Sequence, residues 1–208
     1  MLSLDHLTII APSLAEGIAH IRACLDLDIE DGRTHPEMGT HNRRLRLGTI
    51  YLEVIAVDPG APAPSRPRWF GLDDLTMVRA HWMNGERLRG WVAHTDDIDA
   101  VLAAHGQLLG RKIAIGRHSH FSLRPDGALP LNGVLPSVID RAGQASPVAT
   151  MTERGAKLRD FVLEHPAPAD VTALYDRLGI RNPPRVQEGP SLRYVATIET
   201  ASGVKLLY

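Results

Sequence analysis

Two side chains that can bind a metal ion or transfer a proton occur inside apolar, strand-like stretches of this sequence. His6 lies in LDHLTII, residues 4–10, and Glu53 lies in YLEVIAV, residues 51–57. An imidazole nitrogen and a carboxylate oxygen together suit Fe, Mn, Ni, Co or Zn as ligands. Alternatively, the two side chains hydrogen-bond to each other or line a polar cup that holds no metal. The pair therefore indicates a candidate active site without fixing its reaction.

A strand and a helix are expected to position His6. Alternation along a strand predicts that one face carries Leu4, His6, Thr8 and Ile10. Ser13 is the expected N-cap of a helix over residues 14–25, where apolar residues recur at three- and four-residue spacing. The turn-rich segment 30–42 follows, and strands are expected over residues 43–47 and 49–57. The first unit therefore has the order strand, helix and short strands.

The same order of elements recurs twice further along the chain. In the second copy, Thr95 or Asp96 is the expected helix cap. The Pro125–Gly127 turn predicts a hairpin between strands over residues 121–124 and 128–135. These recurrences predict three modules packed as one compact unit. Their expected bounds are 1–57, 88–141 and 156–208, with a Pro-rich connector and an aromatic segment at 58–87.

The composition excludes several classes of partner. Lys and Arg number 23 against 24 Asp and Glu, so the net charge of -1 gives no general attraction to nucleic acid or to an anionic membrane. No apolar run approaches the roughly 18 residues that span a bilayer. The single cysteine, Cys24, cannot form an internal disulfide, and the first residues lack the features of a signal peptide. We therefore expect a cytoplasmic protein whose partner is a small molecule.

The segments LDHLTIIAPSL, HPEMGTHN and YLEVIAV resemble the glyoxalase-like domain of the vicinal-oxygen-chelate superfamily. The later segments GWVAHTDDIDA, SLRPDGALP and VLEHPAPADV are similar to the rest of that domain, so the resemblance covers nearly the whole chain. It implies an α+β fold in which repeated βαβββ modules form curved mixed sheets around a cup. Metal-dependent members of the superfamily bind a single divalent ion through His and Glu side chains from the first and last strands of the modules.

The resemblance implies that His6 and Glu53 are metal ligands and that Glu53 is also a catalytic residue. The later modules lack their counterparts, since Gly90 or Trp91 stands at the position of His6 in the second module. Either other residues complete the ligand set or the metal has been lost. The candidates for completing it include His94, His118, His120, Asp140 and His165.

Several residues are candidates for contact with the substrate. They are Asn42, His94, His118, His120 and Arg124. His118 and His120 would share one face of a strand if that stretch is extended. The segment RRLRLG, residues 43–48, could also present alternate guanidinium groups to a carboxylate-bearing ligand. Such a segment is more often the solvated edge of a strand.

Two functions remain open. The first is an enzyme of the lyase, isomerase or dioxygenase type, in which a divalent metal held partly by His6 and Glu53 coordinates a small oxygenated substrate. The second is a metal-free protein of the bleomycin-resistance type that binds or sequesters a small molecule in the cup. Motifs of serine hydrolases, P-loop enzymes, zinc proteases and dinucleotide enzymes are absent. A fold that pairs its modules leaves one of three without a partner, which a homodimer would supply.

Overall fold

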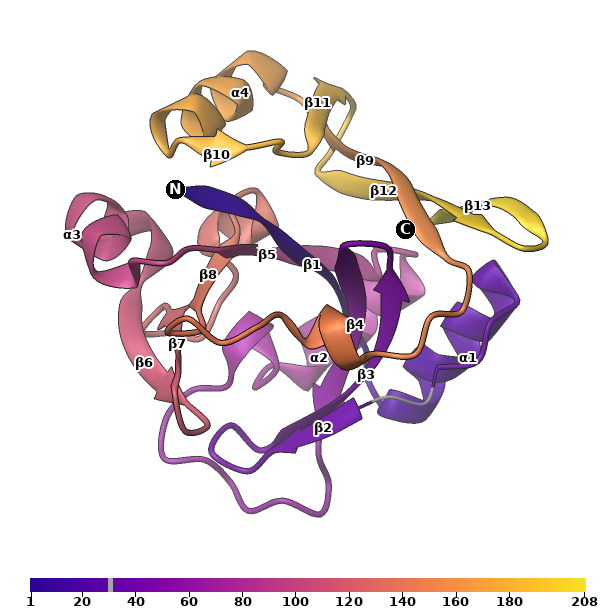
Figure 1. The fold of residues 1–208 in the computed structure, drawn as a ribbon, viewed down its shortest axis with the longest axis horizontal. Helices are drawn as coiled ribbons and strands as arrows, with labels where there is room; N and C mark the ends of the chain where they lie inside the picture. The colour runs from indigo at the N-terminus through magenta and orange to yellow at the C-terminus, as the bar shows by residue number, and fades with distance from the viewer. Residues whose placement is uncertain (30–31) are drawn as a thin grey trace.

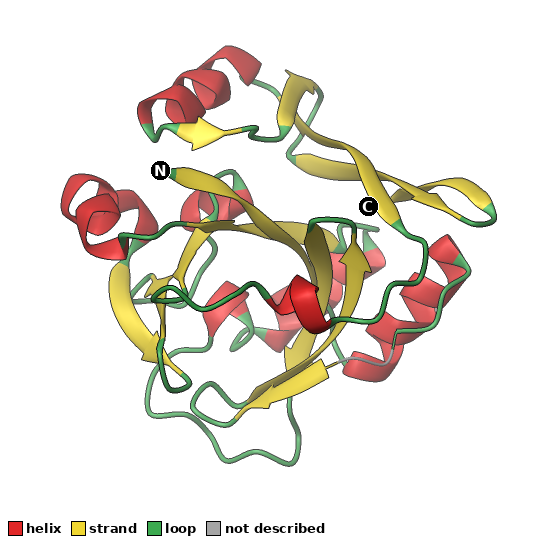
Figure 2. Ribbon diagram, viewed as in Figure 1, coloured by secondary structure: helices red, strands yellow, loops and turns green. Residues whose placement is uncertain are grey.

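The computed structural model describes residues 1–29 and 32–208. The first two residues of the turn-rich segment predicted over residues 30–42 therefore lie outside the described residues. Within the described chain, two β-sheets pack together with several α-helices (Figures 1 and 2). No helix in this part of the chain is both long and apolar enough to cross a membrane.

The larger sheet is built from two halves with the same element order: strand, helix and three strands. The first half comprises β1 (Leu2–Ile10), α1 (Leu14–Leu25), β2 (Gly32–His35), β3 (Thr40–Leu47) and β4 (Ile50–Val57). The second half comprises β5 (Leu88–His94), α3 (Ile98–Leu109), β6 (Arg111–Ile115), β7 (Ser119–Leu123) and β8 (Ser137–Asp140). Between the halves lie a short 3-10 helix, η1 (Trp69–Gly71), and α2 (Leu75–Met83).

The first strand, β1, lies at the centre of the larger sheet. The strand order is β2-β3-β4-β1-β5-β8-β7-β6, and the two halves meet where β1 and β5 pair antiparallel. On its other side β1 pairs parallel with β4. The larger sheet is strongly curved (Figure 2). This arrangement confirms the α+β fold with a curved mixed sheet that the sequence predicts.

The two faces of the larger sheet bury different apolar clusters. The outer cluster contains Leu7 of β1 and Ile21 of α1. The inner cluster lies on the concave side and contains Ile55 of β4, Phe121 of β7 and Ile139 of β8. Burial on both faces explains why β4 is apolar at nearly every position except Glu53.

The smaller sheet packs against the outer cluster of the same chain. Its segment comprises β9 (Lys157–His165), α4 (Pro168–Arg177), β10 (Ile180–Arg181), β11 (Arg185–Glu188), β12 (Arg193–Thr200) and β13 (Gly203–Leu207), of which β10 pairs with β1 (Figure 1). The buried Tyr175 hydroxyl donates a hydrogen bond to the Val134 carbonyl at 2.8 Å. The buried Tyr194 hydroxyl donates one to the Gly133 carbonyl at 2.7 Å. Both tyrosines share the outer cluster with Trp91 of β5.

The strand order of the smaller sheet, β11-β9-β12-β13, differs from that of either half of the larger sheet. In the first half the opening strand β1 pairs with the closing strand β4, whereas β9 lies between β11 and β12. The third unit therefore also begins with a strand and a helix, but four strands follow and their pairing differs. The division into three modules and the homodimer stay predictions.

The cap predicted for the helix after β5 is wrong. An N-cap directly precedes the first helical residue, and α3 begins at Ile98. The Asp97 carboxylate accepts a hydrogen bond from the Ala100 N–H at 2.9 Å, so Asp97 replaces Thr95 and Asp96 as the cap. The Thr95 hydroxyl instead accepts a hydrogen bond from the Asp97 N–H at 3.2 Å.

The hairpin predicted around Pro125–Gly127 is also wrong. β7 ends at Leu123, residues 130–133 form a short 3-10 turn, and β7 pairs antiparallel with β6 instead. Gly127 has a φ of +71, and its carbonyl accepts a hydrogen bond from the Gly71 N–H at 2.9 Å. The turn therefore anchors the aromatic segment between the two halves rather than joining two strands.

Replacing Gly127 by alanine is expected to lower the free energy of unfolding by about 3 kcal/mol or more. The added Cβ would lie 2.1 Å from the Arg68 carbonyl oxygen, and the left-handed φ adds strain. Gly143 has a similar φ of +79 with no atom within 4 Å of a Cβ, so Gly143→Ala measures the strain alone, about 1 kcal/mol. Urea unfolding of both variants tests this, and equal losses would contradict the role of the Arg68 contact.

Candidate functional site

The concave side of the larger sheet holds a cavity of about 590 Å³, a usual size for a small-molecule pocket. Parallel pairing of β1 and β4 sets His6 beside Tyr51 and Thr8 beside Glu53. The His6, Tyr51 and Glu53 side chains line the cavity. A second cavity, of about 280 Å³, lies next to α2 and β12 and is lined by none of the predicted site residues. The larger cavity, hereafter the cup, is the candidate site.

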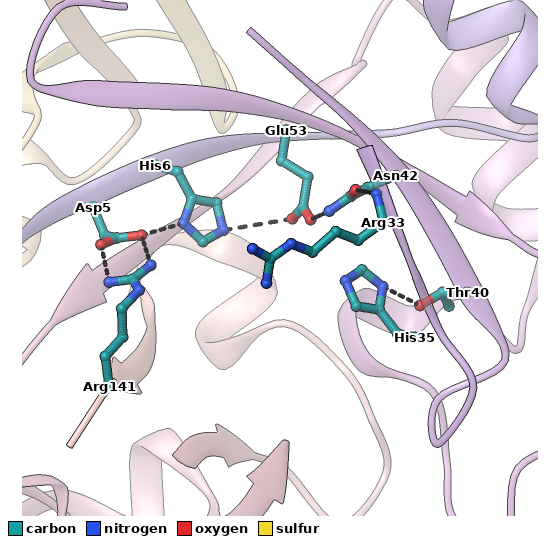
Figure 3. A network of polar contacts seen from close by, with 8 residues as sticks. All are labelled: Asp5, His6, Arg33, His35, Thr40, Asn42, Glu53 and Arg141. Carbon is teal, nitrogen blue, oxygen red and sulfur yellow. Dashed lines mark hydrogen bonds and ion pairs between the residues drawn. The ribbon is translucent and has the colours of Figure 1, made fainter. Parts of the chain in front are cut away.

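A chain of polar contacts crosses the cup (Figure 3). The Asp5 carboxylate lies 2.6 Å from His6 Nδ1, and His6 Nε2 lies 3.5 Å from Glu53 Oε2. The Asn42 amide donates a hydrogen bond to the other Glu53 oxygen at 2.6 Å. Arg141 donates two hydrogen bonds to Asp5, at 2.5 and 2.8 Å. All five side chains are buried, so each depends on these partners for its polar groups.

A β-bulge in β1 explains how Asp5 and His6, neighbours in the chain, meet side by side. In the pairing of β1 with β5, Leu4 lies opposite Ala93 and His6 lies opposite Val92, so Asp5 is an extra residue. Consecutive strand residues normally point to opposite faces, and a bulge changes their aim. At Asp5, the alternation of β1 side chains between the two faces of the sheet therefore shifts by one residue. Leu4 packs with the outer cluster, and the prediction that it shares a face with His6 is wrong.

The contacts determine the protonation of the central pair. An ionised Asp5 only accepts hydrogen bonds, so its contact places a proton on His6 Nδ1. Burial alone would lower the pKa of His6, but hydrogen bonds to Asp5 and Glu53 raise it above its ordinary value. Burial alone would raise the pKa of Glu53, but His6 and, more weakly, Asn42 hold it below its ordinary value. The site therefore favours an ionised carboxylate beside a readily protonated imidazole.

The segment 141–156 joins the two sheets (orange in Figure 1), and its residues between Arg141 and Thr150 line one side of the cup. Its Val148 and Met151 form a small apolar cluster with Tyr51. Tyr51 in turn stacks on the His6 ring, with 4.4 Å between centroids. Burial raises the pKa of Tyr51 well above its ordinary value, so the phenol stays neutral. This segment and Tyr51 therefore shield the imidazole from solvent.

Part of the predicted site meets in the cup. His6, Glu53, Asn42 and His118 all line it. His118 lies in the turn between β6 and β7, whereas His120 lies within β7, so the prediction that these two histidines share a strand face is wrong. Asn42 reaches the cup from β3, where it lies opposite Ile55 of β4.

The other predicted contacts lie elsewhere. His94, His120 and Arg124 are not among the described residues that line the cup. His94 Nε2 lies 3.6 Å from Asp96 Oδ1 at the end of β5. Arg124 donates hydrogen bonds to Asp126 within its turn, at 3.3 and 3.2 Å. Their role in substrate contact stays a prediction, with no position in the cup to support it.

Sequence reasoning missed Asp5, Tyr51 and Arg141. Alternation places Asp5 on the face opposite His6, and only the bulge brings the two together. Arg141 lies 136 residues from Asp5, so no local spacing links them. The adjacent Asp and His letters are the one available signal, because a carboxylate often orients a functional imidazole. In the RRLRLG segment, Arg44 does line the cup.

The donors in the cup fit only part of a metal site. His6 Nε2 and Glu53 Oε2 are 3.5 Å apart, close to the roughly 3.4 Å between two ligands of one tetrahedral ion. Yet within residues 1–29 and 32–208 no group of three or more His, Cys, Asp or Glu side chains could hold a metal. The second half of the sheet contributes Val92 and Ile139 to the inner cluster, and neither is a donor. The residues present therefore do not fit a resident divalent metal.

A family model and a solved structure agree with this fold. The family model described as a glyoxalase-like domain matches residues 4–179. A hypothetical protein from Staphylococcus aureus matches with a TM-score of 0.62 and 12% identity, covering 98% of this chain and 92% of that chain. A variant of Streptomyces coelicolor methylmalonyl-CoA epimerase, solved with 2-nitronate-propionyl-CoA, matches with a TM-score of 0.44 and 21% identity, covering 71% and 100%.

No curated protein matches this sequence. The family model, however, spans most of the chain, and the curved sheet with two βαβββ halves is the architecture of that superfamily. This chain therefore belongs to the glyoxalase-like domain family, within the vicinal-oxygen-chelate superfamily.

Proposed function

We propose that this chain is an enzyme of the isomerase or lyase type that moves a proton on a small oxygenated molecule bound in the cup. Glu53 acts as the base, and His6 donates a hydrogen bond to the substrate oxygen that becomes negative. The observation that supports the proposal is the buried chain of contacts from Asp5 through His6 to Glu53 at the wall of a ligand-sized cavity.

The proposed step needs no group beyond this pair and the substrate. A C–H bond next to a carbonyl breaks, its proton moves to a Glu53 oxygen, and its electron pair forms an enolate. The His6 N–H stabilises the enolate oxygen. Glu53 then returns the proton, or a leaving group departs from the neighbouring carbon. Because Asn42 holds one Glu53 oxygen at 2.6 Å, the other oxygen keeps a fixed orientation for this transfer.

Two other candidate functions would use the same cup. The 3.5 Å separation of His6 Nε2 and Glu53 Oε2 favours a metal-dependent lyase, isomerase or dioxygenase, in which one divalent ion binds both side chains. Asp5 agrees with this candidate, because metal-bound histidines usually donate their other N–H to a carboxylate or carbonyl. A metal-free binding or sequestration protein would use the cavity without any proton transfer. The lack of a third donor among the described residues makes the metal-dependent form the second candidate.

Glu53→Gln is expected to slow proton exchange by about 100-fold or more, because the amide cannot act as a base. The wild type is incubated in D₂O with a panel of small 2-oxo and 2-hydroxy compounds, and loss of the α-proton signal is followed by NMR. Glu188→Gln, at an exposed position on β11, is the control and should exchange at the wild-type rate. Binding of panel compounds without any exchange by the wild type would support the sequestration protein instead.

Protein purified without chelators or an immobilised-metal column is expected to contain well under one equivalent of transition metal. The reason is that the described residues supply two donors, whereas catalytic zinc sites usually have three from the protein. Elemental analysis gives the stoichiometry. A near-stoichiometric metal that is lost in His6→Ala but kept in His20→Ala would establish the metal-dependent candidate.

As the pH rises above about 6.5, the contribution of His6 to stability is expected to fall. The pKa of His6 is raised in the folded protein, so its protonation stabilises the fold fully below the unfolded value of about 6.5, and this gain is lost as the pH rises through the folded pKa. The pKa values of His20 and His35 are lowered, so both are mostly neutral in either state over this range.

The measurement for this pH dependence is urea unfolding of the wild type and of His6→Gln at each pH. The difference in unfolding free energy between the two proteins should shrink as the pH rises from 7 to 9. A constant difference would show that His6 does not gain its proton from the contacts with Asp5 and Glu53.

A further inference from the structure

The wall of the cup carries more basic than acidic side chains. Among its described lining residues, four are arginine and two are glutamate: Arg33, Arg44, Arg117 and Arg141, with Glu37 and Glu53. Both glutamates already accept hydrogen bonds from the protein. Glu37 accepts one from the Gly116 N–H at 3.1 Å, and Glu53 accepts one from the Asn42 amide. The cavity therefore presents an excess of positive charge to whatever enters it.

Two of these arginines are available to a ligand. Arg33 and Arg117 are exposed, and neither guanidinium forms an ion pair or hydrogen bond with another residue in the described part of the chain. Arg33 lies on β2, and Arg117 lies in the turn after β6. β2 and β6 are the two edge strands of the larger sheet. The Glu37–Gly116 hydrogen bond joins these edges at the cup. In Figure 3 the Arg33 side chain extends toward His6 and Glu53.

An aromatic wall also lines the cup. Trp69, Phe70 and Phe121 all line it, and the Trp69 and Phe70 rings contact the Phe121 ring edge to face at 5.4 and 6.0 Å between centroids. Trp69 is 5% exposed, and its Nε1 has no hydrogen-bond partner among the residues that the structure describes. A buried N–H without a protein partner in a pocket wall is a donor that a ligand oxygen can satisfy.

We infer that the molecule bound in this cup is an organic carboxylate with an aromatic body. The carboxylate pairs with Arg33 and Arg117, because guanidinium groups bind carboxylates through two parallel hydrogen bonds. The aromatic body packs against Trp69 and Phe121, and an oxygen of the ligand accepts the Trp69 N–H. This inference rests on the proposed function for the chemistry at Glu53, and it deepens that proposal by naming the substrate class.

Three unreactive probes test the inference. They are 3-phenylpropionate, its neutral amide 3-phenylpropanamide, and propionate, which lacks the ring. Titration calorimetry with the full chain should show 3-phenylpropionate binding at least tenfold more tightly than either of the others. Added salt should weaken the binding of the carboxylate probes and leave the affinity for the amide unchanged. Equal affinities of acid and amide, equal affinities of 3-phenylpropionate and propionate, or no binding of 3-phenylpropionate would each overturn the inference.

Substitutions locate the two parts of the ligand. Arg33→Gln and Arg117→Gln should each lower the affinity for 3-phenylpropionate about tenfold and leave the affinity for the amide unchanged. Trp69→Leu keeps an apolar side chain but removes the ring, so it should weaken the binding of 3-phenylpropionate several-fold and leave the affinity for propionate unchanged. Arg111→Gln is the control, since Arg111 is exposed on β6 and does not line the cup. Wild-type affinity in both Arg33→Gln and Arg117→Gln would contradict the assignment.

The two proposals fail separately. If 3-phenylpropionate binds tightly but no panel compound exchanges its proton, the proposed enzyme activity is contradicted and the inferred ligand class is supported. If only neutral carbonyl compounds exchange their protons and the carboxylate probe does not bind preferentially, the enzyme activity is supported and the inferred ligand class is contradicted.

Discussion

The buried Asp5 carboxylate is the constraint on which the rest of the site depends. A charge that is 6% exposed is stable only when it is paired and hydrogen-bonded, and Asp5 obtains both partners from Arg141 and His6. Arg141 opens the segment 141–156, so pairing Asp5 also brings that segment to one side of the cup. The orientation of the imidazole and the position of one wall of the cup therefore depend on the same buried charge.

The two halves of the larger sheet share an element order but contribute different chemistry. The first half places His6 and Glu53 on the concave face, whereas the second half places Val92 and Ile139 there. A symmetric metal site would draw donors from both halves, whereas His6 and Glu53 both come from the first half. The result is a cup with a polar region beside an apolar region, joined by the aromatic segment that carries Trp69.

The sequence predicts the local parts of this structure and fails where distant segments decide the outcome. The helix over residues 14–25 is confirmed, and the Ser13 hydroxyl accepts a hydrogen bond from the Glu16 N–H at 3.2 Å, because helix caps follow from neighbouring residues. The fold follows from the recurring order of elements and from the family resemblance. The bulge at Asp5 is set by pairing with β5, and its partner Arg141 is contributed by a segment 136 residues away.

Charge balance connects the buried network to the choice of ligand. With His6 protonated, Asp5 and Glu53 carry two negative charges and His6 and Arg141 carry two positive charges, so the network is neutral. The network therefore does not neutralise the negative charge of a ligand carboxylate that enters this site. Arg33 and Arg117 line the cup and can compensate that charge. A divalent cation would instead displace the proton from His6 and leave the network and the lining arginines with a net positive charge. The same arrangement of charges that suits an organic anion thus opposes a bound metal ion.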